Sequence, residues 1–375
     1  MRVLFAGGGT GGHVYPAIAM IDEIRRRDPV AKIGYVGTRR GLEGRILASR
    51  SDIRFFAIHA RGLTRGRPLS TLRTLGWLLL AIVESTLVLV RFRPELIIGV
   101  GGHSSFAPVF LGALVSHVLP LQTAIHEQNV IGGLANRLLS RWVDLTMLSF
   151  EESKRSFPSA KRIAVTGNPI REEMLHVKRS EATYRQFGLE PHRRTILVFG
   201  GSKGSTEIIE QIRIAKHGVA TERDLQILLI TGDKDRTRHL KEEMRAAGAT
   251  NVSIQTYVEQ MGAAFSIADL VVCRAGATSL AEITACGKAS LLVPWRGAAD
   301  DHQWKNALAM RDEGACTVAD EDTIVRHGLV RLIQELVEDE ARLGRLARNA
   351  RRAGQRDARA AILGEIQTLM RGADA

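Results

Sequence analysis

Short apolar runs alternate with longer stretches of helical periodicity along the whole chain. This alternation predicts parallel β-strands connected by helices, because a strand of a parallel sheet is covered on both faces and reads as a continuous apolar run. Both halves of the chain also open alike, with an apolar strand, a glycine cluster and then a helix. The predicted strands are residues 2–6, 32–36, 96–99, 123–125, 162–166, 195–199, 226–231, 270–273 and 290–294.

The two similar halves predict an α/β protein with two facing Rossmann-like domains, each a doubly wound parallel sheet. We expect the domains at 1–166 and 167–350, followed by a C-terminal helix in 351–375 that can pack back on the first domain. Ligands of such sheets bind beyond the carboxyl ends of the strands. The active site is therefore expected in the cleft between the two domains.

Composition narrows the classes of partner. The 375 residues, 45% of them hydrophobic, suit two globular domains, while an aromatic content of 5% disfavours base-stacking platforms and hence nucleic acid. The net charge of +12 needs a partner or another explanation, and nucleic acid, an anionic membrane and phosphorylated small molecules are the candidate partners. Much of the excess lies between Arg342 and Arg371, which is typical of a solvated helix face. The cysteines lack metal-ligand spacing and no paired-histidine signal occurs, so no metal is expected. No cofactor is expected either. The first apolar run is too short for a signal-peptide core, which favours a cytoplasmic location.

The cluster GGGTGG at residues 7–12 lies between the first strand and the first helix. Glycines let the backbone approach a ligand, and amides at a helix N-terminus attract an anion. Because the cluster satisfies G-x-G-x-x-G, a dinucleotide oxidoreductase is an alternative, but the expected ribose-binding acid is replaced by Thr38 and Arg39. His13 follows at the head of the helix. Its imidazole either takes a proton from an attacking hydroxyl or only orients the loop.

Further polar clusters follow other predicted strands. HEQN at 126–129 and GGHSS at 101–105 are candidate functional loops or, alternatively, ordinary turns. RAGATSLAE at 274–282 lets backbone amides reach a diphosphate, and its Glu282 either accepts both hydroxyls of a ribose or lies on the helix surface. DDHQ at 300–303 is a candidate for binding sugar hydroxyls.

Residues 75–90 are nearly all apolar, but they are fewer than the roughly 20 that span a bilayer. Between Arg61 and Arg93 there are six arginines and a single acid, Glu84. A buried core helix is one interpretation, and a helix lying on an anionic membrane is the other. The predicted membrane contacts are Arg65, Arg67, Arg73, Trp77 and Leu78.

Seven motifs occur together and in one order: GGGTGGHVYPAIA, GVGGHSSFAP, HEQNVIGGLANR, GNPIRE, GGSKGS, VCRAGATSLAEI and ADDHQWKNA. In these motifs the chain resembles the bacterial peptidoglycan N-acetylglucosaminyltransferases, from about residue 2 to residue 310. The resemblance implies a glycosyltransferase B arrangement that transfers N-acetylglucosamine from UDP-N-acetylglucosamine, with inversion, to the C4 hydroxyl of undecaprenyl-diphosphate-linked N-acetylmuramyl-pentapeptide. It also implies a peripheral place at the cytoplasmic face of the membrane, with proteins of cell-wall synthesis as further candidate partners.

The resemblance also assigns roles to individual residues. His13 becomes the leading candidate for the general base and Glu127 the second. Lys203, His103 and Ala275 depart from the commoner family pattern, which leaves the phosphate contacts open. A glycolipid synthase and a sugar-nucleotide 2-epimerase of the same architecture remain alternatives. The implied substrate-binding residues are Thr10, Gly11, Gly12, Asn129, Arg171, Ser202, Val258, Ala277, Thr278, Ser279, Leu280, Ala281, Glu282 and Gln303.

Overall fold

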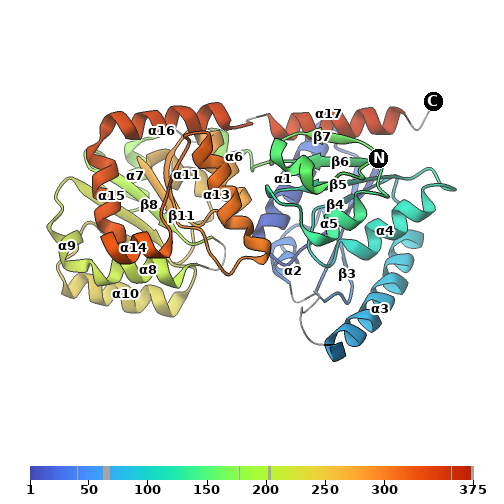
Figure 1. Ribbon diagram of the computed structural model, residues 1–375, viewed down its shortest axis with the longest axis horizontal. Coiled ribbons are helices and arrows are strands. Elements are labelled where there is room, and N and C mark those ends of the chain that lie inside the picture. Colours follow the sequence, from blue (N-terminus) through green and yellow to red (C-terminus); the bar gives the residue numbers. More distant parts are fainter. Residues whose placement is uncertain (40, 62–67, 177, 202–203, 356, 373–375) are drawn as a thin grey trace. The chain divides into compact units, whose positions relative to one another are not determined.

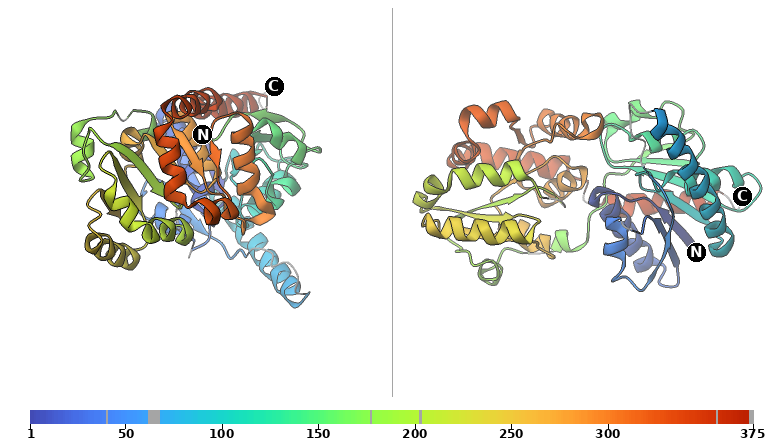
Figure 2. Two further views of the ribbon diagram at one scale, coloured as in Figure 1. Left: turned by 60° about the vertical axis from the view of Figure 1, so that its left-hand side comes forward. Right: turned by 90° about the horizontal axis from the view of Figure 1, so that it is seen from below.

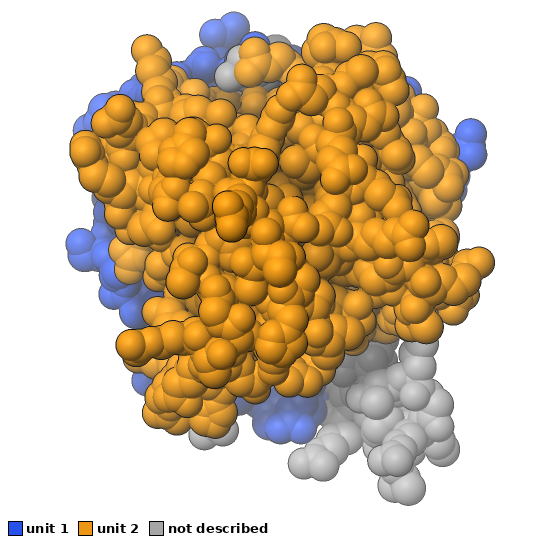
Figure 3. Space-filling view, turned by 90° about the vertical axis from the view of Figure 1, so that its left-hand side faces the viewer, with its two compact units in different colours: residues 1–170, 357–375 blue, residues 171–356 orange. Residues whose placement is uncertain are grey.

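The computed structural model describes residues 1–39, 41–61, 68–176, 178–201, 204–355 and 357–372, without the side chains of 68–75 and Ala299. The chain divides into two compact units (Figures 1 and 3). Unit 1 comprises residues 1–170 and 357–375, and unit 2 comprises residues 171–356. Each unit is an α/β fold of its own and is described separately.

Within the described residues, unit 1 holds a seven-stranded sheet in the order β3-β2-β1-β4-β5-β6-β7, and its recorded strand pairings are parallel. The strands are β1 (Arg2–Ala6), β2 (Lys32–Gly37), β3 (Ile53–Ala57), β4 (Leu96–Gly99), β5 (Gln122–Glu127), β6 (Leu145–Leu148) and β7 (Ile163–Val165). The helices are α1 (Gly11–Arg27), α2 (Leu42–Leu47), α3 (Pro68–Phe92), α4 (Phe106–Val115), α5 (Leu134–Leu139), η1 (Glu151–Ser156) and α17 (Ala358–Arg371).

The described part of unit 2 holds a six-stranded parallel sheet in the order β10-β9-β8-β11-β12-β13. The strands are β8 (Arg194–Phe199), β9 (Leu225–Ile230), β10 (Val252–Gln255), β11 (Leu270–Cys273), β12 (Ala289–Leu292) and β13 (Thr317–Val318). The helices are α6 (Glu173–His176), α7 (Glu181–Gln186), α8 (Thr206–Ile214), α9 (Lys216–Thr221), α10 (Lys234–Ala246), α11 (Met261–Ile267), α12 (Ala277–Cys286), η2 (Ala299–Asp301), α13 (His302–Asp312), α14 (Glu321–His327), α15 (Leu329–Glu338) and α16 (Glu340–Ala353).

The predicted α/β class with two doubly wound sheets is confirmed, and each predicted strand is present with ends that differ by up to two residues. Four strands of the described residues escaped prediction, namely β3, β6, β10 and β13. Of these, β3, β10 and β13 lie at sheet edges. An edge strand pairs on one side only and tolerates polar side chains, so its apolar run is broken, as by Arg54 in β3. β6 is an interior strand, and its length of four residues does not explain why it was missed, because β4 and β11 are equally short.

The C-terminal segment belongs to unit 1, where α17 contacts α1. Ile362, Leu363 and Ile366 of α17 are buried in one hydrophobic cluster with residues of α1 and β1. Arg162, next to β7, forms an ion pair with Glu365 of α17. Both the apolar stripe and this ion pair therefore hold α17 on the sheet of unit 1.

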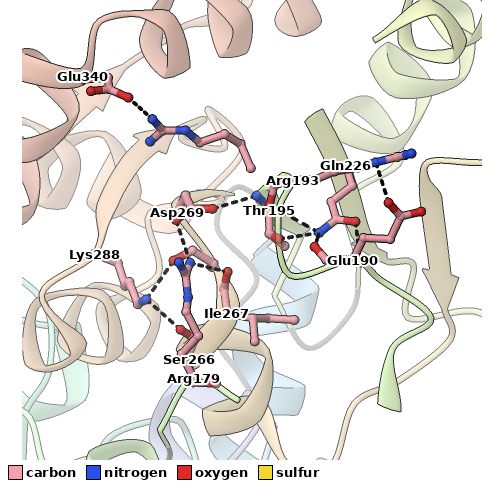
Figure 4. A network of polar contacts seen from close by, with 12 residues as sticks. Arg179, Glu190, Arg193, Thr195, Gln226, Ser266, Ile267, Asp269, Lys288 and Glu340 are labelled. Atoms are coloured by element: carbon pink, nitrogen blue, oxygen red, sulfur yellow. Dashed lines mark hydrogen bonds and ion pairs between the residues drawn. The ribbon is translucent and has the colours of Figure 1, made fainter. Parts of the chain in front are cut away.

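A polar network stabilises the amino ends of the strands in unit 2 (Figure 4). Asp269 accepts a hydrogen bond of 2.8 Å from the Thr195 amide and one of 2.6 Å from Arg179. Lys288 donates to the carbonyl oxygens of Ser266 and Ala268 at the end of α11, at 3.3 and 2.7 Å. Burial lowers the pKa of Lys288 to about 8. These groups lie at the edge of the sheet opposite the strand ends where ligands bind, so we assign them a structural role.

Candidate functional site

The glycine cluster of unit 1 lies at the carboxyl end of β1, and its first amides are bonded within the protein. Gly7 donates to the Val36 carbonyl at 3.1 Å and Gly8 donates to the Gly101 carbonyl at 3.3 Å. The Gly9 amide donates to the carboxylate of Glu43 at 3.0 Å. The helix N-terminus that is expected to attract an anion begins at Gly11, and the amides of Gly7 to Gly9 before it are used by the fold.

The second glycine pair, Gly101-Gly102, lies against this loop. A β-carbon on Gly102 would stand 2.3 Å from the Gly8 carbonyl oxygen, and Gly102 has a φ of 82°. Two segments of backbone therefore touch here, and only glycine leaves room for the contact. A β-carbon on Gly101 would lie 3.0 Å from the ring of His13. The backbone of Gly101 and Gly102 thus packs beside the His13 ring and the Gly8 carbonyl.

The imidazole of His13, in the first turn of α1, has a defined tautomer. Its Nδ1 lies 3.1 Å from the Gly8 carbonyl oxygen and 3.2 Å from Oγ1 of Thr10. A carbonyl oxygen only accepts hydrogen bonds, so Nδ1 carries a proton, and in the neutral ring Nε2 carries the lone pair. The structure therefore fits both readings of His13: it orients the loop through Nδ1, and it presents a basic nitrogen at Nε2.

Glu127, at the end of β5, is almost fully buried and organises the loop that follows it. Its Oε1 accepts from the amide and the side chain of Asn129, at 3.0 and 3.1 Å. Its Oε2 accepts from the Gly133 amide and the Asn136 side chain, each at 2.9 Å. Both oxygens thus position Asn129 and the start of α5. This geometry favours a positioning role over proton transfer.

The remaining members of the HEQN cluster are buried structural groups. His126 contacts the Gly167 carbonyl through Nε2 at 3.0 Å, and its Nδ1 lies 3.0 Å from Nε2 of Gln128. Burial lowers the pKa of His126 to about 4, so the ring is neutral near pH 7. Gln128 also donates to the Val100 carbonyl at 3.2 Å. The cluster therefore divides into two core residues, Glu127 as an anchor, and Asn129, which is partly exposed.

In unit 2, the conspicuous charged pair is Arg171 and Glu282. Glu282 projects from α12, which starts just beyond the carboxyl end of β11, and is 7% exposed. Nη2 of Arg171 lies 3.5 Å from Oε1 of Glu282, and its Nη1 lies 3.0 Å from Oε1 of Glu173. Burial raises the pKa of Glu282 to about 6, although Arg171 opposes this shift. A buried carboxylate beside a guanidinium at a strand end is suited to bind hydroxyls and phosphate together.

Arg274, between β11 and α12, is a residue whose role the sequence did not reveal. Its Nη1 donates to the Val293 carbonyl at 3.1 Å, and its guanidinium forms an ion pair with Glu207 of α8. Burial lowers the pKa of Arg274 below its usual value. This side chain connects the segment before α12 to the residue after β12 and to the first turn of α8. The sequence did offer one indication of this role, because Arg274 directly follows a buried strand.

The loop between β12 and α13 carries the predicted sugar-binding cluster. Oε1 of Gln303 accepts from the Trp295 amide at 3.0 Å. Asp300 and Asp301 have φ values of 51° and 56°, a left-handed conformation that non-glycine residues adopt at a cost. The guanidinium of Arg296 lies 4.1 Å from the centroid of the Trp304 ring. The loop is thus held in a specific shape by contacts of its own.

The implied substrate-binding residues are divided between the units. Thr10, Gly11, Gly12 and Asn129 lie in unit 1, with His13 and Glu127. Arg171, Val258, residues 277–282 and Gln303 lie in unit 2, where Val258 is buried near the end of β10. Ser202 and Lys203 lie outside the described residues, as do Arg65 and Arg67 of the predicted membrane contacts.

The long helix α3 has one buried and one exposed apolar face. Ala81, Ser85, Val88 and Phe92 are buried, which matches one helical stripe, and Leu78 packs against the same core. Trp77 stacks on His59 with ring centroids 5.7 Å apart, and Arg61 lies over its ring. The side chain of Arg73 is outside the described part. The exposed face presents Leu79, Leu80, Val83, Leu87 and Val90.

α3 lies on the outside of unit 1 beside α4 (Figures 1 and 2). Leu114 on α4, with Val118 and Leu119 just after it, adds further exposed apolar side chains. Among the described residues, no helix is long and apolar enough to cross a membrane. The helix is therefore neither a buried core helix, as one interpretation held, nor a spanning segment within the described part.

Two doubly wound parallel sheets, each with polar side chains at its strand ends, define the glycosyltransferase B class of sugar-nucleotide enzymes. Sequence profiles agree with the geometry. The glycosyltransferase family 28 N-terminal domain matches residues 3–147, and the C-terminal domain of that family matches residues 195–362. The chain belongs to glycosyltransferase family 28.

Curated relatives cover nearly the whole chain. Proteins of Lactiplantibacillus plantarum and Geotalea uraniireducens are 36% and 38% identical over 99% and 98% of this chain, and over 100% and 98% of their own lengths. Both are named UDP-N-acetylglucosamine–N-acetylmuramyl-(pentapeptide) pyrophosphoryl-undecaprenol N-acetylglucosamine transferase. These relatives share the family and the length of this chain.

Two solved structures resemble this chain over nearly its whole length. MurG of Acinetobacter baumannii matches with a TM-score of 0.74 and 26% identity over 98% of this chain and 99% of that protein. UDP-GlcNAc 2-epimerase of Neisseria meningitidis, bound to UDP-GlcNAc, matches with a TM-score of 0.69 and 16% identity over 98% of this chain and all of that chain. At 16% identity, the similarity to the epimerase shows a shared fold and nothing about activity.

Proposed function

We propose that this enzyme transfers N-acetylglucosamine from UDP-N-acetylglucosamine to the C4 hydroxyl of undecaprenyl-diphosphate-linked N-acetylmuramyl-pentapeptide, with inversion at the anomeric carbon. The full-length relatives named for this reaction support the substrate pair. The observation that carries the proposal in the structure is the Arg171–Glu282 pair at the carboxyl end of the sheet in unit 2. It combines a cation for a diphosphate with a carboxylate for a ribose.

The proposal assigns separate roles to the residues of the two units. In unit 2, Glu282 accepts hydrogen bonds from the ribose hydroxyls and Arg171 faces the diphosphate. Asn129 of unit 1 and Gln303 of unit 2 meet the sugar. Unit 1 binds the acceptor and unit 2 binds the nucleotide sugar.

The chemistry is one displacement. The C4 oxygen of the acceptor forms a bond to the anomeric carbon while the bond from that carbon to the UDP phosphate oxygen breaks. Nε2 of His13 accepts the hydroxyl proton, and UDP leaves with the electron pair of the broken bond. The Nδ1–H bond to Gly8 keeps the basic nitrogen on the other side of the ring. Glu127 supports the step by holding Asn129.

We also propose peripheral binding of unit 1 to the cytoplasmic face of the membrane, where a lipid-linked acceptor is found. The exposed apolar face of α3 and its neighbours at the end of α4 support this proposal. Exposed Arg91 and Arg93 at the end of α3 are suited to anionic headgroups. Apolar insertion and charge attraction together give reversible attachment.

The decisive experiment incubates the enzyme with radiolabelled UDP-N-acetylglucosamine and bacterial membrane extract. Label is expected in a lipid fraction from which mild acid releases it, as for a polyprenyl diphosphate. Label in an acid-stable diacylglycerol lipid would instead indicate a glycolipid synthase. Conversion of the nucleotide sugar to its 2-epimer without any lipid acceptor would indicate an epimerase. Either result would overturn the proposed function.

A further inference from the structure

Glu43, in the helix that follows β2, carries a buried carboxylate that has no part in the proposed transfer reaction. Glu43, in α2, is fully buried. Its Oε1 accepts from the amide and the hydroxyl of Thr38 at 2.8 and 2.7 Å, and its Oε2 accepts from the Gly9 amide at 3.0 Å. Burial alone would raise its pKa, but these hydrogen bonds lower it below the usual value. Glu43 is therefore ionised near pH 7.

Three glycines from separate places in the sequence make room for this carboxylate. A β-carbon on Gly8 or Gly41 would lie 2.3 Å from the Glu43 side chain, and one on Gly37 would lie 2.6 Å from it. Real β-carbons essentially never lie within 3.0 Å of another heavy atom. Alanine at any of the three positions would therefore displace the carboxylate. The glycines at 8, 37 and 41 thus serve the packing of Glu43.

One peptide group links Glu43 to His13. The amide nitrogen of Gly9 and the carbonyl of Gly8 belong to the same peptide unit, which is trans. In a trans peptide the N–H and the C=O point in opposite directions. The N–H of this unit donates to Glu43, and its C=O accepts from Nδ1 of His13. A carboxylate, a peptide group and an imidazole therefore form a continuous chain of hydrogen bonds.

We propose that Glu43 is a positioning residue that holds and polarises the Gly8–Gly9 peptide, and through it fixes the tautomer and raises the basicity of His13. A hydrogen bond from the N–H to a carboxylate increases the negative charge on the C=O of the same peptide, because hydrogen bonds in a chain polarise one another. A stronger acceptor at Nδ1–H makes Nε2 more basic, as a carboxylate does when it contacts an imidazole directly. This inference rests on the proposed role of His13.

Other titratable groups near Glu43 bear on the test. Tyr35 of β2 is buried, and its pKa lies well above the usual value because of burial and the charge of Glu43. His103, after β4, lies over Gly9, where a β-carbon would stand 3.7 Å from its Cε1. Burial lowers the pKa of His103, while Glu43 opposes this shift. The experiment must therefore assign the imidazole signals of His13 and His103 separately.

The test replaces Glu43 by Gln, which keeps an acceptor for Gly9 but removes the charge. NMR of 15N-histidine-labelled protein, assigned with His13→Gln and His103→Gln, follows the tautomer and pKa of His13 directly. We expect the pKa of His13 to fall by about half a unit. The acid limb of the pH dependence of kcat/KM should move to lower pH by the same amount, because the base must be unprotonated. Above that limb kcat should fall by about two- to threefold, because a weaker base gives a slower proton transfer, with UDP affinity unchanged.

The matched control is Glu23→Gln, which removes another buried carboxylate at the far end of α1, where it pairs with Arg26 and Arg27. It should leave the His13 signals and the pH profile unchanged. If Glu43→Gln does not fold, Thr38→Val removes one donor to the carboxylate and should shift His13 by a smaller amount. Folded Glu43→Gln with an unchanged tautomer and pKa of His13 would overturn the inference. A normal kcat in His13→Gln would instead refute the proposed role of His13 as the general base. The NMR measurement would still decide whether Glu43 sets the tautomer and pKa of His13.

Discussion

Nη2 of Arg171 lies 3.5 Å from Oε1 of Glu282, and both groups stand at the carboxyl end of the unit 2 sheet. Arg171 lies between two carboxylates, since Glu173 contacts its Nη1 at 3.0 Å. The arginine therefore holds Glu282 in place before any nucleotide contributes its own charge. Such preorganisation reduces the entropy lost when a nucleotide binds.

The assignment of Glu282 to the ribose predicts a loss of sugar discrimination. Glu282→Ala should weaken UDP binding about 10- to 150-fold, because hydrogen bonds to a charged acceptor contribute about 1.5–3 kcal/mol. Glu282→Gln should lie between that variant and the wild type. Titration calorimetry with UDP and 2′-deoxy-UDP measures the preference directly. The wild type should prefer the ribose form, and folded Glu282→Ala that keeps this preference would refute the assignment.

The raised pKa of Glu282 predicts a pH dependence of nucleotide binding. With a pKa of about 6, the carboxylate is ionised at pH 7.5 and protonated at pH 5. The ionised form is the better acceptor, so UDP affinity should fall as the pH drops through about 6. UDP phosphate titrates in the same range, and Glu282→Gln controls for that. The ratio of wild-type to Glu282→Gln affinity should shrink toward pH 5, and a constant ratio would contradict the prediction.

The proposed base predicts a loss of turnover without a loss of donor binding. His13→Ala should lower kcat by roughly 10²- to 10⁴-fold, the usual contribution of a positioned general base. UDP affinity should change little, because Arg171 and Glu282 lie in the other unit. Steady-state rates beside calorimetric titration separate the two quantities. Near-normal kcat in the variant would remove His13 from the mechanism.

The exposed face of α3 predicts hydrophobic attachment to membranes. Replacing Leu79, Val83 and Leu87 by Gln should reduce binding to vesicles about tenfold or more, because the three aliphatic side chains no longer insert. Flotation with lipid vesicles measures this binding. Val30→Gln with Val325→Gln is the matched control, since both valines are 82% exposed and neither belongs to α3. Equal flotation of the triple variant and this control would show that the face does not enter the bilayer.

A separate charge contribution is expected from the arginines before and within the first turns of α3. Exchange of Arg65, Arg67 and Arg73 for Glu should release the protein from anionic vesicles, since each Arg near such a surface contributes about 1 kcal/mol. Binding of the wild type should also fall as salt is added. Binding to uncharged vesicles should stay low for both proteins. Unchanged flotation of the Glu variant would refute the charge contribution.

The sequence by itself determined the α/β class, the two doubly wound sheets and the places where polar residues follow strands. These features depend on periodicity and on glycines next to strand ends, which are local properties of the chain. They were predictable because a buried parallel strand must be apolar throughout. Edge strands such as β3 and β10 were missed because pairing on one side relaxes that demand.

Only the tertiary structure decided what the glycines at residues 7–9 do. The sequence placed these glycines between a strand and a helix, but it did not show that their amides donate to Val36, Gly101 and Glu43, which are distant along the chain. Hydrogen-bond partners of this kind depend on which strands lie side by side, and residue spacing carries no such information. For the same reason the sequence did not identify Glu43 as a buried carboxylate, although Gly37, Gly41 and Gly8 all leave room for its side chain. A buried carboxylate is recognised by the donors around it, and those donors come together only when β1 and β2 pair.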